Sequence, residues 1–486
     1  MRKVNIYITL FVIAFLLLPF TGCENALEEK TFTTLSPNDF LTNEEDVEVL
    51  LNSVYGVLRY SDITRDAITL NEVNTDIHIE RNGGIFAANE LMEEFIWTSS
   101  HSYLQAWWEL RYKTIYNANV VLDNVPDVDM DEDRKEEVLA EARFLRAFSY
   151  YLLYDLFGPV PLIVSSETAV TDRPARASKE EMISFIENEL IFASEILPVE
   201  PPRNEYGRPT KGAALGILAK FYMMTKKWNN AADTSLEVMG LGKYDLFTSG
   251  NRTALFSPEN QRDNEFIFVA NMSDTPNDNT GSGWLSHVVP SGYQWQYPPR
   301  AIFAAEFKLR TEFLNLFEAD DERLDAILFE YVNANGDTIE LGEDDARSLK
   351  FPEYPNQDIS RDSGDFPFLR YADILLSRSE ALNELNGLNQ ESVDLLNMIR
   401  DAAGVSIFNV ADFSGKDAFR DFILDERGRE FHTEALRRQD LIRHGKFIET
   451  AIGRGKSAED FRVLFPIPQT EIERNTSLIQ NEGYSQ

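Results

Sequence analysis

Aromatic side chains gathered in one short stretch are the residues of this chain best suited to contact a ligand. Trp284, Tyr293, Trp295 and Tyr297 lie among glycines and prolines, a composition typical of a loop. The alternation of the last three would place their rings on one side of an extended segment. Exposed rings stack on the apolar face of a sugar or against a peptide side chain. The same rings would also serve to pin the loop to the core, and the sequence leaves both interpretations open.

Residues that catalyse reactions form no recognisable pattern in this chain. Its five histidines are His78, His101, His287, His432 and His444. They show no metal-ligand spacing, and neither H-E-x-x-H nor G-x-S-x-G occurs. With 81 acidic residues, glycoside hydrolysis stays open as an alternative, which needs two carboxyl groups about 5–9.5 Å apart in a cleft. No single pair stands out, so we expect no catalytic residue and no cofactor.

Two short motifs resemble ligand-binding loops but fail at the positions that matter most. An acidic run alternates like the start of an EF-hand, with Asp127, Asp129, Asp131 and Asp133. Its sixth position is Glu132 and its twelfth is Val138, where a calcium loop needs glycine and glutamate. The acidic N-terminus of a helix explains the run better. Gly455–Ser457 ends like a phosphate loop, but Thr450 replaces the first glycine and no strand precedes it.

The N-terminus carries the pattern of an export signal. Two basic residues precede an apolar run over 6–20, which is too short and too early for a permanent membrane helix. A small-residue site ending in glycine follows, and then Cys23, the only cysteine. This arrangement resembles the lipobox of bacterial lipoproteins, with an ordinary secretory signal as the alternative. We expect 1–22 to be a lipoprotein signal peptide, Cys23 to carry acyl chains, and 23–35 to be a tether.

The composition and net charge limit the kinds of molecule that this protein can bind. The chain has 486 residues, 43% of them hydrophobic, which is ample for a large core. Its formal charge is −35, and removal of Arg2 and Lys3 with the signal makes it two units more negative, near −37. A field of this sign repels nucleic acid and anionic membrane surfaces. A polyanionic substrate would need a local basic patch, and the sequence contains no long basic run.

Helical periodicity and capping signals dominate the rest of the chain. Ser178 with Glu181 forms a capping box, and Gly158-Pro159 is a helix stop. The segment 211–240 carries small and aromatic residues at the offsets of a tetratricopeptide hairpin. The segments expected to be helical are about 43–58, 107–124, 134–156, 178–197, 211–240, 371–403 and 417–446.

Between about residues 244 and 367, strand and loop signals replace the helical periodicity. Residues 265–269 read as a strand, and Asn335-Gly336 marks a hairpin turn between two short strands. The expected fold is mainly α, a tetratricopeptide-like helical-repeat scaffold with a loop- and strand-containing insertion. Its expected parts are an N-terminal helical region over 36–243, a ligand-binding insertion over 244–367, and a C-terminal helical region over 368–486.

Four blocks of sequence carry a family likeness along nearly the whole chain. They are Trp108–Leu110 with Ile115 and Ala118-Asn119; Glu141–Phe148 through Phe157–Leu162; Asp425–Phe431 with Arg438–Leu441; and Leu464–Pro468 with Glu471-Ile472 and Gln480–Tyr484. Together with the lipobox they resemble the SusD/RagB family, the surface lipoproteins of Bacteroidota that partner a TonB-dependent outer-membrane transporter.

The resemblance implies a tetratricopeptide-containing helical fold with a variable insertion, and no catalysis. It also implies ligand contacts from two places, a polar stretch before the first signature helix and the aromatic insertion. The matching positions are Asp76, Arg81, Trp97, Trp284, Tyr293, Trp295 and Tyr297. The charged residues Glu426, Arg427, Arg429 and Glu430 are expected to form scaffold ion pairs. No metal ligands are assigned, and whether calcium helps is left open.

The expected function is capture of oligosaccharides at the outer membrane and their delivery to a SusC-like TonB-dependent transporter. The protein would be exposed on the cell surface and held to the membrane by its N-terminal lipid, without nucleic-acid partners. Capture of peptides is the first alternative, because some relatives serve peptide import. A surface glycoside hydrolase and a purely structural transporter subunit are the others.

Overall fold

The computed structural model describes residues 41–60, 63–80, 87–168, 172–272, 281–297, 301–303, 305–355 and 363–485. The fold given below is that of the unit Asn43–Gln486. Cys23 and Arg81 lie outside the described residues. Over the described ranges, none of the helices combines the length and apolar character needed to cross a membrane.

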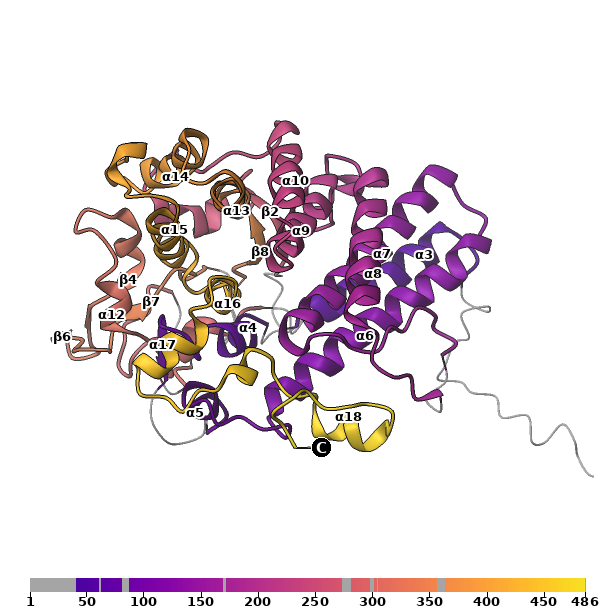
Figure 1. Ribbon diagram of the computed structural model, residues 1–486, viewed down its shortest axis with the longest axis horizontal. Coiled ribbons are helices and arrows are strands. Elements are labelled where there is room, and N and C mark those ends of the chain that lie inside the picture. The colour runs from indigo at the N-terminus through magenta and orange to yellow at the C-terminus, as the bar shows by residue number, and fades with distance from the viewer. Residues whose placement is uncertain are drawn as a thin grey trace, which may run out of the picture. The chain divides into compact units, whose positions relative to one another are not determined.

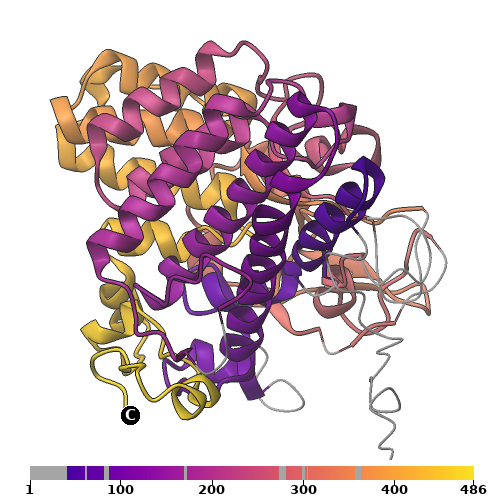
Figure 2. The same cartoon turned by 90° about the vertical axis from the view of Figure 1, so that its right-hand side faces the viewer.

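Helices make up most of this unit (Figures 1 and 2). Those of six or more residues are α3 (Glu44–Leu58), α4 (Ile63–Asn71), α5 (Ala87–Glu93), α6 (Ser102–Asn124), α7 (Glu132–Phe157), α8 (Lys179–Ile196), α9 (Lys211–Met224), α10 (Trp228–Gly240), α13 (Tyr371–Asn386), α14 (Gln390–Ala402), α15 (Lys416–Phe431), α16 (Arg437–Arg443), α17 (Phe447–Gly453) and α18 (Gln469–Arg474). From α6 to α10 each helix packs against the next, and α3 packs against α6. The mainly helical, tetratricopeptide-like fold is confirmed.

The helical series is interrupted after α10 and then resumes. α13 packs against α10 and α9, and α14 and α15 pack against α13 in turn, as Figure 1 shows. The intervening segment contains most of the strands, which are β2 (Phe266–Ala270), β3 (Phe307–Leu309), β4 (Ile327–Leu328), β5 (Glu330–Val332), β6 (Thr338–Glu340), β7 (Arg347–Ser348) and β8 (Phe366–Arg370). In the described residues they form antiparallel pairs, β2–β8, β4–β7 and β5–β6, while β3 pairs with β1 (His78–Glu80).

Local capping explains where several helices begin. The Asn43 side chain accepts a hydrogen bond from the amide of Asp46, and α3 starts at the next residue after Asn43. Ser178 and Glu181 form the reciprocal capping box of α8. Asp131 accepts from the amide of Arg134 and caps α7, which confirms that the acidic run is a helix N-terminus. These side chains satisfy amide groups that have no partner inside the helix.

A close approach between α9 and β8 depends on Gly216. A Cβ added at this position would lie 2.3 Å from a methyl carbon of Leu369, which is far inside van der Waals contact. The small buried side chains of Ala219 and Ala231 lie in the same region of the helical hairpin. Small residues therefore let α9 pack tightly against both its helical neighbour and the strand pair.

One expected helical segment is broken. Residues 417–446 form α15 and α16 with a bend between them, where Thr433 and Ala435 have φ angles of 67° and 61°. The buried carboxylate of Glu72 accepts hydrogen bonds from the amides of Thr433, Glu434 and Ala435 at 2.8, 3.1 and 2.7 Å. This tertiary contact compensates a left-handed backbone that non-glycine residues rarely adopt.

Buried ion pairs join the insertion to the C-terminal helices. Glu430 on α15 pairs with Arg252 at 2.5 Å, with Arg370 at 3.0 Å and with Arg323 at 3.2 Å. Glu426, one turn earlier, pairs with Arg323, Arg400 and Arg429. Arg427 pairs with Asp373 and Asp440. The expectation that these charged residues serve the scaffold is confirmed.

This network predicts a loss of stability in acid. Burial raises the pKa of Glu426, but Arg323, Arg429 and Arg400 outweigh it and lower the pKa to about 2. A carboxylate whose pKa is lower in the folded than in the unfolded chain stabilises the fold above the unfolded value of about 4.3, and this contribution disappears as the pH falls through the folded value. We therefore expect urea unfolding midpoints to fall steadily from about pH 4.5 to pH 2. The part of the unfolding free energy that Glu426 loses over this range is on the order of 3 kcal/mol.

The matched measurement is the same pH series on Glu426→Gln, which cannot titrate at this position. Its unfolding free energy should be lower than that of the wild type at pH 7 and should depend less steeply on pH below 4.5. An identical pH dependence in both proteins would show that Glu426 contributes nothing to acid sensitivity.

Candidate functional site: an aromatic segment held by Glu353

The aromatic stretch follows a short helix, α11 (Trp284–Val288), and runs beside the β5–β6 hairpin. Gly292, with a φ of +86°, turns the chain so that Tyr293 forms an antiparallel bridge with Asn333 at the end of the hairpin. Tyr331 on β5 donates its hydroxyl hydrogen to the carbonyl of Ser291 at 3.0 Å. The hairpin thus provides the frame on which residues 293–297 lie.

A single carboxylate fixes the path of the segment. Glu353 accepts the hydroxyl hydrogen of Tyr293 at 3.2 Å and the amide hydrogens of Gln296 and Tyr297 at 2.9 and 3.3 Å. Burial raises the pKa of Tyr293, and the charge of Glu353 raises it further. Tyr293 therefore stays protonated at neutral pH and can keep donating to Glu353.

Alternation along the segment separates aromatic from amide side chains. Tyr293, Trp295 and Tyr297 are half-buried, whereas Gln294 and Gln296 between them are exposed. The rings of Tyr293 and Trp295 meet edge to face, with centroids 5.3 Å apart and planes at 83°. The segment therefore offers ring surface together with amide donors and acceptors, which is the combination that a saccharide ligand uses.

Further apolar surface lies on the neighbouring hairpin. Phe329 is 46% exposed and lies two residues before Tyr331, a spacing that places both side chains on the same side of an extended chain. The ring of Tyr331 lies 6.4 Å from that of Tyr293. Exposed apolar side chains beside a ring cluster extend the area over which a ligand would be desolvated.

Trp284 does not belong to this surface. Its side chain is completely buried, with its ring 4.9 Å from that of Phe307 and 5.9 Å from that of His78. Its indole nitrogen donates a hydrogen bond to the Ser348 carbonyl at 3.4 Å. The predicted ligand contact of Trp284 is wrong, because a buried helix, not a loop, carries this ring, and the ring packs in the core.

Trp97 is likewise a packing residue. It is 1% exposed, and its indole nitrogen donates to the hydroxyl of Tyr484 at 2.8 Å. Phe95 and Phe465 lie against its ring, and the guanidinium of Arg462 lies 5.1 Å from the ring centre. Trp97 therefore connects the start of the helical series to the C-terminal end of the chain and presents no ring to a ligand.

Asp76 has both carboxylate oxygens engaged within the protein. Arg437 on α16 donates to them at 2.8 and 2.6 Å. Burial raises the pKa of Asp76, but the adjacent Arg437 outweighs it, and the net pKa is lowered. The expected sugar contact of Asp76 is thus corrected to an ion pair between the segment after α4 and α16. Arg81, its expected neighbour, is outside the described residues.

The structure thus brings together Tyr293, Trp295 and Tyr297 and separates them from the other expected positions. Tyr331 and Glu353, which hold the segment, were not identified from the sequence. The hairpin signal at Asn335-Gly336 indicates indirectly that Tyr331 lies on a strand, because a turn of this kind joins two antiparallel strands and Tyr331 comes shortly before it. Nothing in the sequence around Glu353 indicated its role.

Two family models and several known proteins match this chain. A family model described as "Starch-binding associating with outer membrane" matches residues 27–223, and a model described as "SusD family" matches residues 345–484. SusD-like protein P25 of Formosa agariphila is 25% identical, over 98% of this chain and 99% of that protein. Starch-binding protein SusD of Bacteroides thetaiotaomicron is 24% identical, over 71% of this chain and 72% of that protein.

A solved structure agrees in fold. The structure named "Laminarin binding SusD-like protein" superposes with a TM-score of 0.78 at 24% identity, covering 91% of this chain and 100% of that chain. At this level of identity the likeness establishes the fold.

Proposed function

This chain belongs to the SusD/RagB family, and from that membership we propose that it captures oligosaccharides at the cell surface and delivers them to a partner TonB-dependent outer-membrane transporter. Like the starch-binding and laminarin-binding relatives, it is a binding protein and not an enzyme. Family members associate with the outer membrane.

The observation that carries the glycan proposal is the aromatic segment, defined as residues 293–297. Its half-buried rings alternate with exposed glutamine amides, so apolar and hydrogen-bonding contacts are available within one short stretch. Glu353 restrains the backbone of the segment before any ligand arrives, which reduces the entropy cost of binding. The names of two relatives, starch-binding SusD and a laminarin-binding protein, support a glucan or related glycan as the ligand class.

Glu353 also bears on the hydrolase alternative. It is the carboxylate that lies against the aromatic segment, and it already accepts three hydrogen bonds from that segment. A general acid must instead hold a proton ready for the leaving group. Glu353 thus acts as a structural acceptor, and binding without cleavage is the function that its geometry favours.

The test is an array of oligosaccharides and of peptides probed with residues 24–486. We expect glycans to be retained and peptides not, because rings stack on the apolar face of a sugar while the exposed glutamine amides can hydrogen-bond its hydroxyl groups. Binding to peptides alone would replace the proposal with peptide capture. Release of shortened glycans into the wash would replace it with hydrolysis.

Membrane attachment through Cys23 is part of the proposal. Acyl chains contribute about 0.8 kcal/mol per buried CH₂ group, so a chain without the modified cysteine would lose its hold on the bilayer. In the native cell, Cys23→Ser is expected to move the protein from the membrane fraction to the soluble fraction and to reduce uptake of the glycan that the array identifies. Retention of the variant in the membrane would contradict lipid anchoring, and undiminished uptake despite release would contradict delivery to a transporter.

A further inference from the structure

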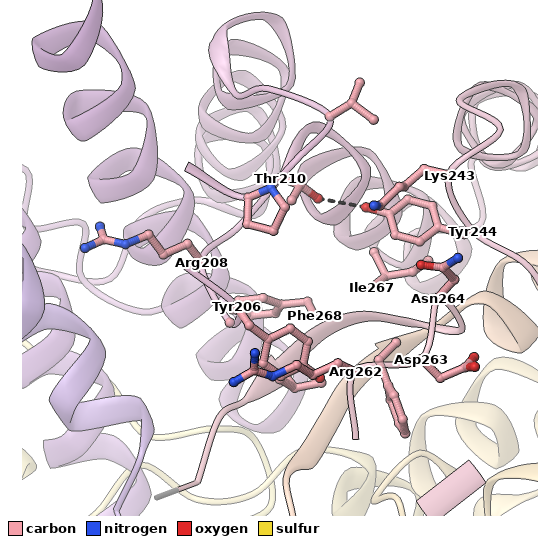
Figure 3. A pocket seen from close by; sticks show the side chains of 15 residues that line it. Tyr206, Arg208, Thr210, Lys243, Tyr244, Arg262, Asp263, Asn264, Ile267 and Phe268 are labelled. Carbon is pink, nitrogen blue, oxygen red and sulfur yellow. Dashed lines mark hydrogen bonds between the residues drawn. The ribbon is translucent and has the colours of Figure 1, made fainter. Parts of the chain in front are cut away.

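A second hollow lies away from the aromatic segment, between α3, the segment 205–208 and β2. It has a volume of about 380 Å³ and is lined by Asn52, Arg59, Tyr206, Arg262 and Asn271, among others. A smaller cavity of about 100 Å³ shares the residues Tyr206–Arg208 and part of β2 with it, and Figure 3 shows the side chains of this smaller cavity.

The arginines of this hollow are in unequal electrostatic situations. Arg208 donates to Glu48 at 3.0 Å, to Glu141 at 2.9 Å and to Glu205 at 2.7 Å, so carboxylates already surround its charge. In Figure 3 its side chain extends away from the pocket toward the neighbouring helix. Arg208 therefore holds the wall of the hollow together and has no charge to offer a ligand.

Arg59 and Arg262 have no such partners among the described residues. Within the described residues neither guanidinium lies within 4.0 Å of a carboxylate oxygen, and the buried Nε of Arg59 has no hydrogen-bond acceptor. The guanidinium carbon of Arg262 lies over the ring of Tyr206, 5.5 Å from the ring centre. This contact orients the guanidinium without neutralising it.

One acid influences both arginines from a distance. Asp365 is buried, accepts a hydrogen bond from the amide of Met272 at 2.7 Å, and is attracted by both Arg59 and Arg262. Burial raises the pKa of Asp365 to about 7 in spite of this attraction. At neutral pH its carboxyl group is therefore only partly ionised and balances less than one of the two positive charges.

We propose that this hollow binds the anionic group of a saccharide, a carboxylate or a sulfate, between Arg59 and Arg262. The proposal rests on the proposed function, in that the ligand is an oligosaccharide, and it adds that the ligand carries acidic units. The guanidinium group presents paired N–H donors that match the two oxygens of a carboxylate or sulfate. Asn52 and Asn271 line the same hollow. The Asn271 amide nitrogen donates to the carbonyl of Tyr206 at 3.1 Å, and the Asn52 amide oxygen accepts from Arg208 at 3.4 Å, so the Asn271 oxygen and the Asn52 nitrogen are the amide atoms that suit the hydroxyl groups of a sugar ring.

The charge of the whole chain restricts the kind of anion. At a formal charge of −35 the protein repels densely charged polymers, whereas a local pair of arginines attracts a single acidic group at close range. An otherwise neutral saccharide with isolated acidic units fits both conditions. The fold creates this cationic site from residues far apart in the sequence, which is why no basic run announces it.

The experiment compares glucose, glucuronate, glucose 6-sulfate and inorganic sulfate by NMR titration of residues 24–486. At least one of the two acidic sugars is expected to bind ten or more times more tightly than glucose, and the stronger of the two identifies the anionic group. The double variant Arg59→Gln/Arg262→Gln should lose this preference while its affinity for glucose stays the same. Arg474→Gln, an exposed arginine on α18 that is paired with Glu471, is the matched control and should keep the preference.

Three results would overturn the proposal: equal binding of the acidic sugars and glucose, an unchanged preference in the double variant, or inorganic sulfate binding as tightly as glucose 6-sulfate. The last would reduce the site to one for simple anions. These outcomes are separate from failure of the proposed function, which the oligosaccharide and peptide array and the variants of the aromatic segment report. A protein that binds neutral glycans normally while the arginine variants change nothing would refute this inference alone.

Discussion

Replacement of Arg370 by alanine is expected to lower the free energy of unfolding by about 3–5 kcal/mol. Arg370 ends β8 and is 1% exposed. Its guanidinium donates to both oxygens of Glu434, at 2.8 and 2.6 Å, to Glu430 at 3.0 Å, and also to Glu265. Truncation would leave these buried carboxylates with one positive partner fewer, and an uncompensated buried charge costs more than the pair itself contributes.

The measurement is urea denaturation at pH 7 of the wild type and of two variants. Arg420→Ala is the matched control, because Arg420 also pairs with a glutamate, Glu384, but its side chain is 30% exposed. We expect this control to lose less than about 1 kcal/mol, as exposed ion pairs do. Equal losses for Arg370→Ala and Arg420→Ala would show that the buried network contributes no more than a surface pair.

The second large effect concerns ligand affinity. Trp295→Ala combined with Tyr297→Ala is expected to weaken binding of the array-selected glycan by about 30-fold, which corresponds to about 2 kcal/mol. Both rings belong to the aromatic segment and neither is fully buried, so their loss removes contact surface and leaves the core intact. Isothermal titration calorimetry on the wild type and the double variant gives the ratio directly.

Two controls separate binding from folding in this experiment. Tyr116→Ala removes a ring that is 53% exposed on α6 and should leave the affinity unchanged. Equal urea midpoints for wild type and double variant would show that the fold is intact. Trp284 is unsuitable for such a test, because truncation of a fully buried tryptophan costs about 3–5 kcal/mol of stability by itself. Unchanged affinity in a folded Trp295→Ala/Tyr297→Ala protein would place the ligand elsewhere.

Most helices could be predicted because their signals are local. The caps at Asn43 and Ser178 and the stop at Gly158 depend on residues within one turn of the helix end, and each lies where the sequence indicated. The hairpin at Asn335-Gly336 is equally local, and β5 and β6 flank it. The predicted start of α6 at Trp107 is wrong: the helix begins five residues earlier, at Ser102, and no side-chain cap hydrogen bond marks that start.

The features that sequence reasoning missed depend on distant partners. β1 is only three residues long and forms because it pairs with β3, more than 200 residues away. The bend after α15 depends on the carboxylate of Glu72, which no neighbouring residue reveals. Asp76, Trp97 and Trp284 have residue types that suit ligand binding. In the folded chain Asp76 instead pairs with Arg437, Trp97 donates to Tyr484, and Trp284 is buried in the insertion. Only these tertiary contacts show that the three side chains are unavailable to a ligand.

The most direct test of the central claim is a crystal structure of residues 24–486 with the glycan that the array identifies. We expect a sugar ring against Trp295 or Tyr297, with hydrogen bonds to Gln294 or Gln296 and with the Glu353 contacts to the segment retained. A glycan bound elsewhere, with residues 293–297 untouched, would contradict the assignment of the aromatic segment as the glycan-binding site.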